Sequence, residues 1–315
     1  PEKLGKRVLT TGGHFGYLKI AEGCDKHCTY CIIPKLRGRF RSVPMERLLE
    51  QAQEMAEQGV KELILVAQET TVYGTDIYGK KSLHVLLKEL CRIKGIRWIR
   101  VLYCYPEEIY DELIQTMKEE KKICHYLDLP IQHASDRILK RMGRRTTKAE
   151  LVAIVNKLRE EIPDIVLRTT LITGFPGETQ EDHEELMEFV DEMEFDRLGV
   201  FTYSPEEDTP AATMPDQVPE EVKEDRRDEI MELQQEISYD KGTDRIGQEL
   251  MVMIEGKVAD ESAYIGRTYG DAPKVDGYIF VQTGELLMTG DFAKVRVTGA
   301  LEYDLIGELA DEYTE

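Results

Sequence analysis

Three cysteines lie close together near the start of the chain, in the segment Cys24-Asp25-Lys26-His27-Cys28-Thr29-Tyr30-Cys31. The segment follows the short apolar stretch 18–21, so we expect the three thiols to share one loop after a strand. Three thiolates at these spacings can bind three irons of a cuboidal iron–sulfur cluster. The fourth iron then has no protein ligand, and an open iron beside a cavity can bind a small molecule. We therefore expect the chemistry of this protein at this loop.

The residues alone leave other readings of this loop open. A structural zinc ion normally has four ligands, so His27 or a distant group would have to complete the set. Cys28 and Cys31 alone match a redox C-x-x-C pair, which needs no third cysteine. A disulfide framework is disfavoured, because six cysteines in 315 residues without a signal-peptide pattern fit a reducing cytoplasm. Cys91, Cys104 and Cys124 have apolar neighbours and no ligand spacing, which predicts buried, inert thiols.

The charge of the chain narrows the class of partner. With 61 acidic and 41 basic residues, the formal net charge is −20. Such a field repels phosphate backbones and attracts basic partners, although a local basic patch overrides it. No apolar run approaches the roughly 20 residues that a bilayer-spanning helix needs, so we expect no membrane association.

Helix and strand patterns alternate over the first two thirds of the chain. We expect strands at 18–21, 63–67, 99–103, 126–129, 166–172 and 198–203, with helices starting near residues 42, 82, 107, 135, 147 and 179. Six such units predict an α/β fold, an open or closed barrel of parallel strands with outer helices. The active site of such a barrel lies at the carboxyl ends of its strands.

The last third of the chain has a different pattern. A proline-rich connector precedes a charged helix at 220–239, and five short alternating stretches follow at 250–254, 264–268, 278–281, 293–298 and 303–309. Short strands with glycine-containing turns predict a small OB-like β-barrel. The expected organisation is therefore a lead-in at 1–16, a barrel at 17–204, a connector and helix at 205–244, and a small barrel at 245–315.

Polar groups follow several of the expected strands. Gln68 and Glu69 come after the second strand, where they also suit a turn. Gln132 and Ser135 come after the fourth, and Ser135 is equally suited to cap the next helix. Gly174 and Glu178 follow the fifth. Arg168 enters the fifth strand, where it could bind an anion or form a structural salt bridge, and His133 could serve as a structural histidine or a proton carrier.

The cysteine spacing, with Tyr30 before the last cysteine and strand–helix repeats after it, resembles the signature of the radical S-adenosylmethionine enzymes. The resemblance implies a 4Fe-4S cluster bound by Cys24, Cys28 and Cys31, whose open iron chelates S-adenosylmethionine. By the same resemblance Tyr30 lies near the adenine, and Gln68 and Glu69 face the methionyl amine. Further cofactor or substrate contacts are expected at Gln132 and Ser135, at Arg168 for the methionyl carboxylate, and at Gly174 and Glu178. No proton-transferring catalytic residue is identified.

A partial (βα)6 barrel followed by a small TRAM-like β-barrel resembles the methylthiotransferases, and the stretches 37–42, 129–135, 173–179 and 209–212 support this. From residue 245 onward, six basic residues stand against fourteen acidic ones, a net charge of −8. An RNA-binding barrel is expected to be basic, so this one suits a cationic protein instead. The stretches 203–208 and 271–277 resemble the RimO-type branch. That branch adds a methylthio group to the β-carbon of an aspartate in a small-subunit ribosomal protein.

The resemblance carries further expectations. Complete members have an N-terminal domain with a second iron–sulfur cluster that delivers sulfur, and we expect the present chain to lack it. It should then cleave S-adenosylmethionine without completing methylthiolation. We also expect an external electron donor, RNA binding that does not dominate, and a cytoplasmic location. The alternatives are a methylthiotransferase acting on tRNA adenosine and, outside the enzymes, a metal-stabilised binding module without turnover.

Overall fold

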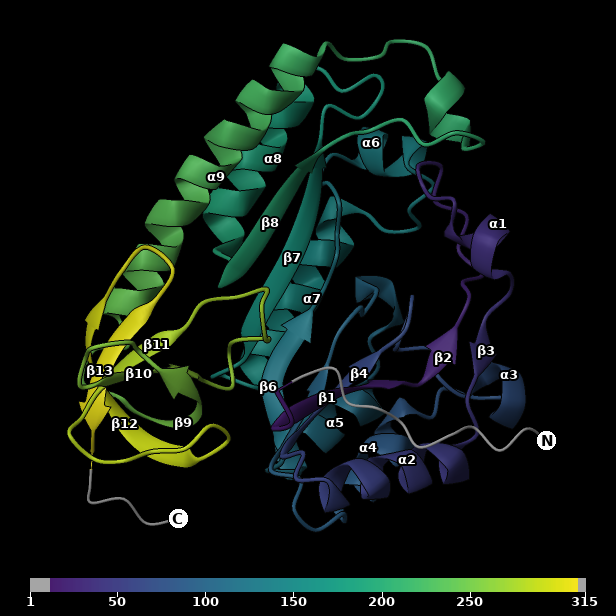
Figure 1. Cartoon of the computed structure of the whole chain (residues 1–315). Coiled ribbons are helices and arrows are strands. Elements are labelled where there is room, and N and C mark those ends of the chain that lie inside the picture. The colour runs from purple at the N-terminus through teal and green to yellow at the C-terminus, as the bar shows by residue number, and fades with distance from the viewer. Residues whose placement is uncertain (1–11, 311–315) are drawn as a thin grey trace.

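The computed structural model describes residues 12–310, so most of the expected lead-in, residues 1–11, lies outside the described residues. Six parallel strands form one sheet in the order β1-β4-β5-β6-β7-β8 (Figure 1). The strands are β1 (Phe15–Lys19), β4 (Glu62–Val66), β5 (Trp98–Val101), β6 (Ile123–Asp128), β7 (Val166–Thr173) and β8 (Arg197–Thr202). The expected α/β fold is confirmed, and the strands curve into an open half-barrel.

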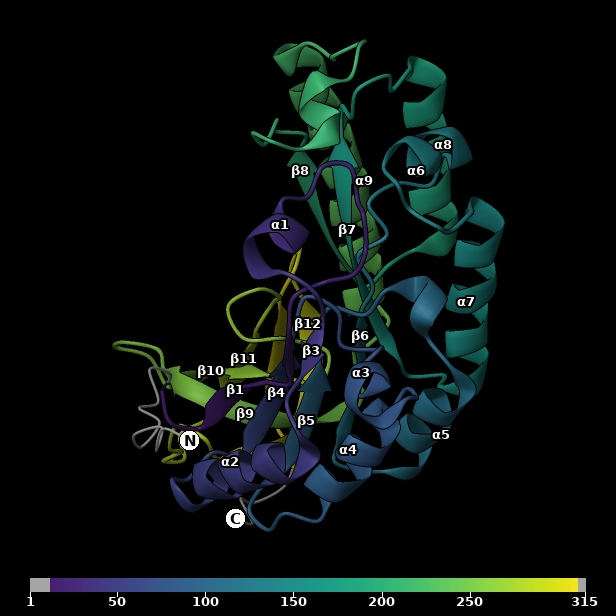
Figure 2. The same cartoon turned by 90° about the vertical axis from the view of Figure 1, so that its right-hand side faces the viewer.

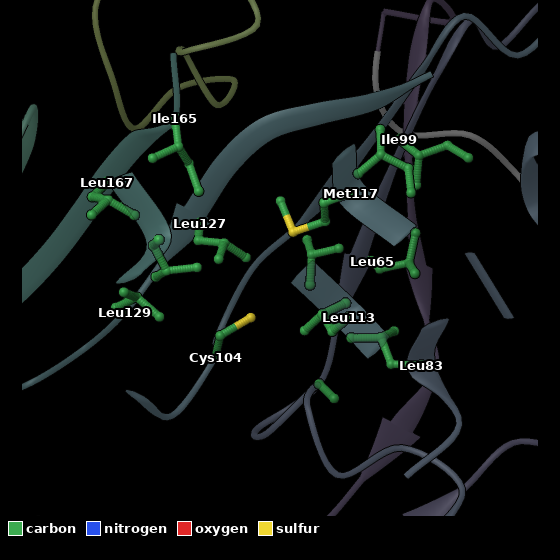
Figure 3. Close-up of a cluster of buried hydrophobic side chains, with 14 of the residues drawn as sticks. Leu65, Leu83, Ile99, Cys104, Leu113, Met117, Leu127, Leu129, Ile165 and Leu167 are labelled. Atoms are coloured by element: carbon green, nitrogen blue, oxygen red, sulfur yellow. The ribbon is translucent and has the colours of Figure 1, made fainter. Parts of the chain in front are cut away.

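Helices cover the outer face of this sheet (Figure 2). They are α2 (Met45–Glu57), α4 (Leu83–Cys91), α5 (Asp111–Glu119), α7 (Lys148–Glu161) and α8 (Gln180–Met193). Alternation along the strands turns Leu65, Ile99, Leu127 and Leu167 outward, where they pack against Leu83, Leu113 and Met117 of the helices (Figure 3). All seven side chains are buried, so this layer is the main hydrophobic core. None of the described helices is long and apolar enough to cross a membrane.

The last five strands form a closed barrel in the order β10-β11-β13-β12-β9. Their bounds are β9 (Glu249–Lys257), β10 (Ala263–Arg267), β11 (Ile279–Gln282), β12 (Phe292–Ala300) and β13 (Leu305–Leu309). The long helix α9 (Glu220–Thr243) leads into this small barrel and packs against α8 and β8 (Figure 1). The predicted small β-barrel is therefore confirmed.

The small barrel covers the amino-terminal part of the concave face of the sheet, which we call the floor. Met253 and Phe292 of the small barrel pack there against Phe15 and Trp98 of the half-barrel. Fully buried ion pairs reinforce the apolar contact, because Glu62 binds Arg100 of β5 at 3.1 Å and Arg267 of β10 at 2.9 Å. The opposite end of the concave face, at the carboxyl ends of the strands, is called the mouth.

Several element boundaries differ from the expected ones. β1 begins at Phe15, within the expected lead-in. The helix expected from residue 42 begins at Met45, since Ser42 belongs to the short strand β3 (Arg41–Ser42) and its hydroxyl donates to Asp76 at 2.6 Å. The helix expected from about residue 107 is a 3₁₀ turn, η1 (Pro106–Glu108), and α5 starts only at Asp111.

Candidate active site

The cysteine loop connects β2 (Ala21–Glu22) to the short helix α1 (Ile33–Arg37) at the mouth. Gly23 opens the loop with φ +84°, and a Cβ atom there would lie 2.2 Å from the carbonyl oxygen of Arg39. Only glycine fits this close backbone approach. Farther along, the Thr29 amide donates to the Met142 carbonyl at 2.9 Å, so the loop is fixed to the end of α6 (Asp136–Arg141).

The three predicted cluster ligands are free thiols. Cys24 and Cys28 are buried and Cys31 is half-buried, and burial raises the pKa of Cys24 and of Cys31. The Lys26 amide donates to the Cys24 sulfur at 3.4 Å, and the Tyr105 hydroxyl lies 3.5 Å from the Cys28 sulfur. Protein donors aimed at sulfur are typical of iron–sulfur sites, where they help to set the potential.

No three His, Cys, Asp or Glu side chains within residues 12–310 converge on a point as ligands of a single metal ion would. A cuboidal cluster is bound at separate irons, so its thiolate ligands need not converge in this way. Three thiols on one loop beside a cavity therefore match the donor set that such a cluster requires. Their role as ligands stays a prediction.

A cavity of about 490 Å³ opens next to the loop. Cys24 and Cys31 line it from the loop, Gln68 lines it after β4, and Lys19 and Tyr103 line it from the ends of β1 and β5. The volume lies in the range of roughly 300–1,000 Å³ that is typical of small-molecule sites. The cavity thus joins the cysteine loop to the carboxyl ends of three neighbouring strands, where the sequence predicts the site.

Gln68 and Glu69 lie at the end of β4 as expected. The Gln68 side-chain oxygen accepts from the Gly23 amide at 2.8 Å and so connects this strand end to the cysteine loop. Burial raises the pKa of Glu69 to about 7, although hydrogen bonds from the Thr71 hydroxyl and amide oppose the shift. One Glu69 carboxyl oxygen, Oε2, is buried and has no hydrogen-bond partner among the described residues, which is unusual for a buried acceptor.

Tyr30 packs away from the cavity lining. Its ring meets the edge of Phe175 at a centroid distance of 6.4 Å, in a small cluster that includes Tyr203. Burial, together with the nearby Cys28, raises the pKa of the Tyr30 phenol. A contact between Tyr30 and an adenine stays a prediction.

Gln132 and Ser135 differ in how completely their polar atoms are used. Gln132 has φ +71°, a left-handed conformation that is uncommon for a residue other than glycine, and its buried Oε1 has no partner in the described chain. Ser135 is the residue before α6, yet its hydroxyl donates to Asp182 at 2.7 Å instead of capping the helix. Gln132 therefore has the free acceptor that a ligand contact needs.

Glu178 is the centre of a buried network behind the mouth. Its carboxylate accepts from the Gly174 amide at 2.9 Å, lies 2.7 Å from His133 Nε2, and binds Arg226 of α9 at 2.9 Å. Burial opposes ionisation, but the hydrogen bond and charge of His133 outweigh it and lower the pKa of Glu178. His133 thus has a hydrogen-bonded structural role, which is one of the two roles expected for it from the sequence.

Arg168 lies on the concave side of β7 and forms a structural salt bridge, which is one of the two roles expected for it from the sequence. Its guanidinium lies 2.8 Å from Asp276 in the small barrel and 3.7 Å from Asp128 of β6. Binding of a methionyl carboxylate by Arg168 stays untested.

Sequence reasoning missed two groups at the mouth. Tyr103 has φ +56°, lines the cavity and is nearly half exposed. Arg144 is buried against the ring of Tyr105 at 4.2 Å, and its Nε and Nη1 have no partner within residues 12–310. Neither has a local signal, because no glycine or asparagine marks the turn at Tyr103 and Arg144 lies in a run of ordinary surface-type residues. The expected burial holds for Cys104 and Cys124, whereas Cys91 is half-buried.

A parallel half-barrel with three free thiols at the carboxyl ends of its strands is the arrangement of a radical S-adenosylmethionine enzyme. The model of the Radical SAM superfamily matches residues 18–190, and the TRAM domain model matches residues 246–310.

Close relatives carry one description. "Ribosomal protein uS12 methylthiotransferase RimO" of Lachnoclostridium phytofermentans is 67% identical over 301 residues, which are 96% of this chain and 68% of that protein. Proteins of the same description from Clostridium perfringens and Clostridium botulinum are 56% and 52% identical over 98% and 99% of this chain, and the chain covers 68% and 69% of them. The chain belongs to the radical S-adenosylmethionine superfamily and, within it, to the RimO methylthiotransferase family.

Solved structures agree on the fold. Coproporphyrinogen III oxidase of Escherichia coli, a radical SAM enzyme, superposes with a TM-score of 0.55 at 17% identity, over 89% of this chain and 66% of that chain. The methyltransferase TsrM of Kitasatospora setae superposes with a TM-score of 0.52 at 17% identity, over 63% of this chain and 38% of the TsrM chain. The expected resemblance is confirmed, and the superfamily implies a 4Fe-4S cluster and S-adenosylmethionine.

Proposed function

We propose that this chain is a radical S-adenosylmethionine methylthiotransferase that acts on an aspartate of the small-subunit ribosomal protein uS12. The observation that carries the proposal is the 67% identity to a RimO protein over 96% of the chain. It is supported by the three thiols beside a cavity at the carboxyl ends of parallel strands. The β-carbon of the aspartate would receive the methylthio group.

Cys24, Cys28 and Cys31 would hold the cluster in this proposal. A cluster held there would provide electron transfer for the reductive cleavage of S-adenosylmethionine and so the hydrogen-atom abstraction that the superfamily uses. The unpartnered oxygens of Glu69 and Gln132 would bind and orient the cofactor. The surrounding apolar and aromatic side chains would keep water and stray hydrogen donors away from the radical.

The partners follow from the substrate. A ribosomal protein is cationic and cytoplasmic, and it would dock through electrostatic complementarity with the acidic chain. An external protein would supply the electron. A second cluster, held outside these 315 residues, would supply the sulfur.

The test uses uS12 labelled with deuterium at the β-carbon of its aspartates. We expect the anaerobically reconstituted, reduced chain to form 5′-deoxyadenosine that carries deuterium, without a gain in uS12 mass. Completed methylthiolation by this chain alone would contradict the proposed source of sulfur. Turnover on tRNA with salt-sensitive binding would instead favour the tRNA-modifying alternative, and an intact cluster without 5′-deoxyadenosine would leave a binding module.

A further inference from the structure

Charged side chains lie in one row across the concave face of the half-barrel, from the carboxyl end of β1 to the amino-terminal parts of β7 and β8. The register pairs Lys19 of β1 with Val66 of β4, Asp128 of β6 with Arg168 of β7, and Arg168 with Arg197 of β8. Side chains alternate along a strand, so Lys19 shares the concave face with Phe15 and Tyr17, whereas Leu18 lies in the outer core. This row therefore holds three cations, of which Lys19 alone lines the cavity beside Cys24 and Cys31.

The other two cations of the row are neutralised by the small barrel. Arg168 binds Asp276 at 2.8 Å, and Arg197 binds Asp271 at 2.6 Å. Both carboxylate side chains are almost completely buried, so an incoming anion would have to displace a buried partner at high cost. Arg168 and Arg197 are thus committed to holding the small barrel.

Lys19 has a partner that it can release. It binds Glu22 at 2.9 Å, and the same carboxylate binds Arg37 of α1 at 3.1 Å. Because Glu22 would keep Arg37, Lys19 can turn to another anion without leaving a lone carboxylate. The Lys19 side chain is about half exposed, so this exchange costs little.

We propose that Lys19 binds the side-chain carboxylate of the target aspartate, an inference that rests on the proposed function. An aspartate entering a chain with a net charge of −20 needs a local cation. Lys19 and Arg37 both line the cavity, and Arg37 remains paired with Glu22, which leaves Lys19 for the aspartate. The ion pair would hold the adjacent β-carbon toward the cysteine loop. It would also discriminate aspartate from asparagine, which has the same shape without the charge.

Tyr103 lines the same cavity as Lys19. Its amide donates to Asp128 at 3.0 Å and its carbonyl accepts from the Thr70 amide at 3.0 Å, so two neighbouring strand ends fix its left-handed backbone. Strained backbone of this kind persists where surrounding contacts over-determine it, commonly at functional sites. The backbone of this lining residue is therefore held in place at the cavity.

The test measures binding of uS12 by the reconstituted chain with S-adenosylmethionine present, by calorimetry. Two forms of uS12 are used, one with the target aspartate and one with asparagine in its place. We expect the wild-type chain to prefer the aspartate form by about 10- to 100-fold, as for a hydrogen bond between charged groups. The Lys19→Met variant should bind both forms of uS12 with the affinity that the wild-type chain has for the asparagine form. Lys19→Arg should restore the preference for the aspartate form.

Matched controls separate the outcomes. Lys35→Met removes an exposed α1 cation that pairs with Asp208 outside the cavity lining, and it should leave both affinities unchanged. An unaltered preference in Lys19→Met, or an equal loss for both forms of uS12, would overturn the proposal. So would a weaker affinity for S-adenosylmethionine with the preference retained, because Lys19 would then serve the cofactor. If the wild-type chain binds neither form, the proposed function fails first and the subsite fails with it.

Discussion

The mouth and the floor of the half-barrel differ in how their buried acidic and amide side chains are paired. At the floor, the carboxylates of Glu62, Asp271 and Asp276 each bind an arginine across the contact between the two barrels. At the mouth, Glu69 and Gln132 each keep a buried oxygen without a partner among residues 12–310. Buried polar atoms are nearly always paired, and unpaired ones require an explanation. The floor therefore pairs its carboxylates with arginines of the protein itself, whereas the mouth leaves two buried side-chain oxygens for a ligand.

The strongest test of this comparison is Cys28→Ala at the mouth. We expect loss of cluster binding and of 5′-deoxyadenosine formation to below detection, because a cuboidal cluster depends on its thiolates. The free energy of unfolding of the cluster-free chain should change by only about 1 kcal/mol. Iron content measures cluster binding, and denaturant unfolding measures the free energy of unfolding. Cys91→Ala, outside the loop, serves as the control. A variant that retains the cluster would break the assignment.

At the floor, Arg267→Met should have the reverse effect. It leaves Glu62 and Glu255 buried beside fewer cations, and we expect destabilisation by about 3–5 kcal/mol in urea unfolding. The matched control is Arg296→Met in the same small barrel, where the pair with Glu249 at 2.8 Å is exposed to solvent and should contribute far less to the free energy of unfolding. Equal effects of the two substitutions would mean that the floor is not held by its buried charges.

Glu69→Gln sharpens the comparison through pH. The Glu69 pKa rises from its ordinary 4.5 to about 7 in the folded chain, so the folded state binds the proton more tightly than the unfolded state. Stability from this group is therefore present below pH 4.5 and is lost as the pH rises toward 7. The glutamine variant lacks this loss, and its stability relative to wild type should increase by about 2–3 kcal/mol across that range. Unfolding of the cluster-free chain at several pH values checks this, with the exposed Glu54→Gln as control, and a pH-independent difference would refute it.

Of these substitutions, Gln132→Gly should change the free energy of unfolding the least. Glycine adopts the φ of +71° without strain, which offsets the roughly 0.4–1 kcal/mol that its greater freedom in the unfolded chain costs, so we expect the stability of the cluster-free chain to stay nearly unchanged. Affinity for S-adenosylmethionine should fall, because the unpartnered amide oxygen is removed. Thermal unfolding and equilibrium dialysis measure the two changes. A destabilised variant with normal affinity would show that Gln132 belongs to the structure instead.

The sequence predicted what depends on local patterns. The strands 63–67 and 166–172 lie within one or two residues of β4 and β7, because apolar runs and turn signals are local. The cysteine loop followed from spacing alone. The start of α2 was wrong by a few residues because Ser42 uses its hydroxyl on Asp76, a partner 34 residues away.

Pairing between the two barrels could not be predicted from the sequence. Arg168 and Asp276 are separated by 108 residues, and no periodicity connects them. The acidic surplus from residue 245 was interpreted as a surface for a cationic partner, yet Glu255, Asp271 and Asp276 face arginines or a histidine of the described chain. Net charge counts residues without regard to where they lie, so part of that surplus is internal.

The ion pairs from Asp271 to β8 and from Asp276 to β7 limit how the small barrel can move when a protein substrate binds. Since the small barrel is fastened to the sheet by buried charges, it cannot swing aside when a protein approaches. The distance from the outer surface of the small barrel to the cysteine loop then stays constant. A protein that binds the outer surface of the small barrel would therefore have to reach the cysteine loop across a fixed distance.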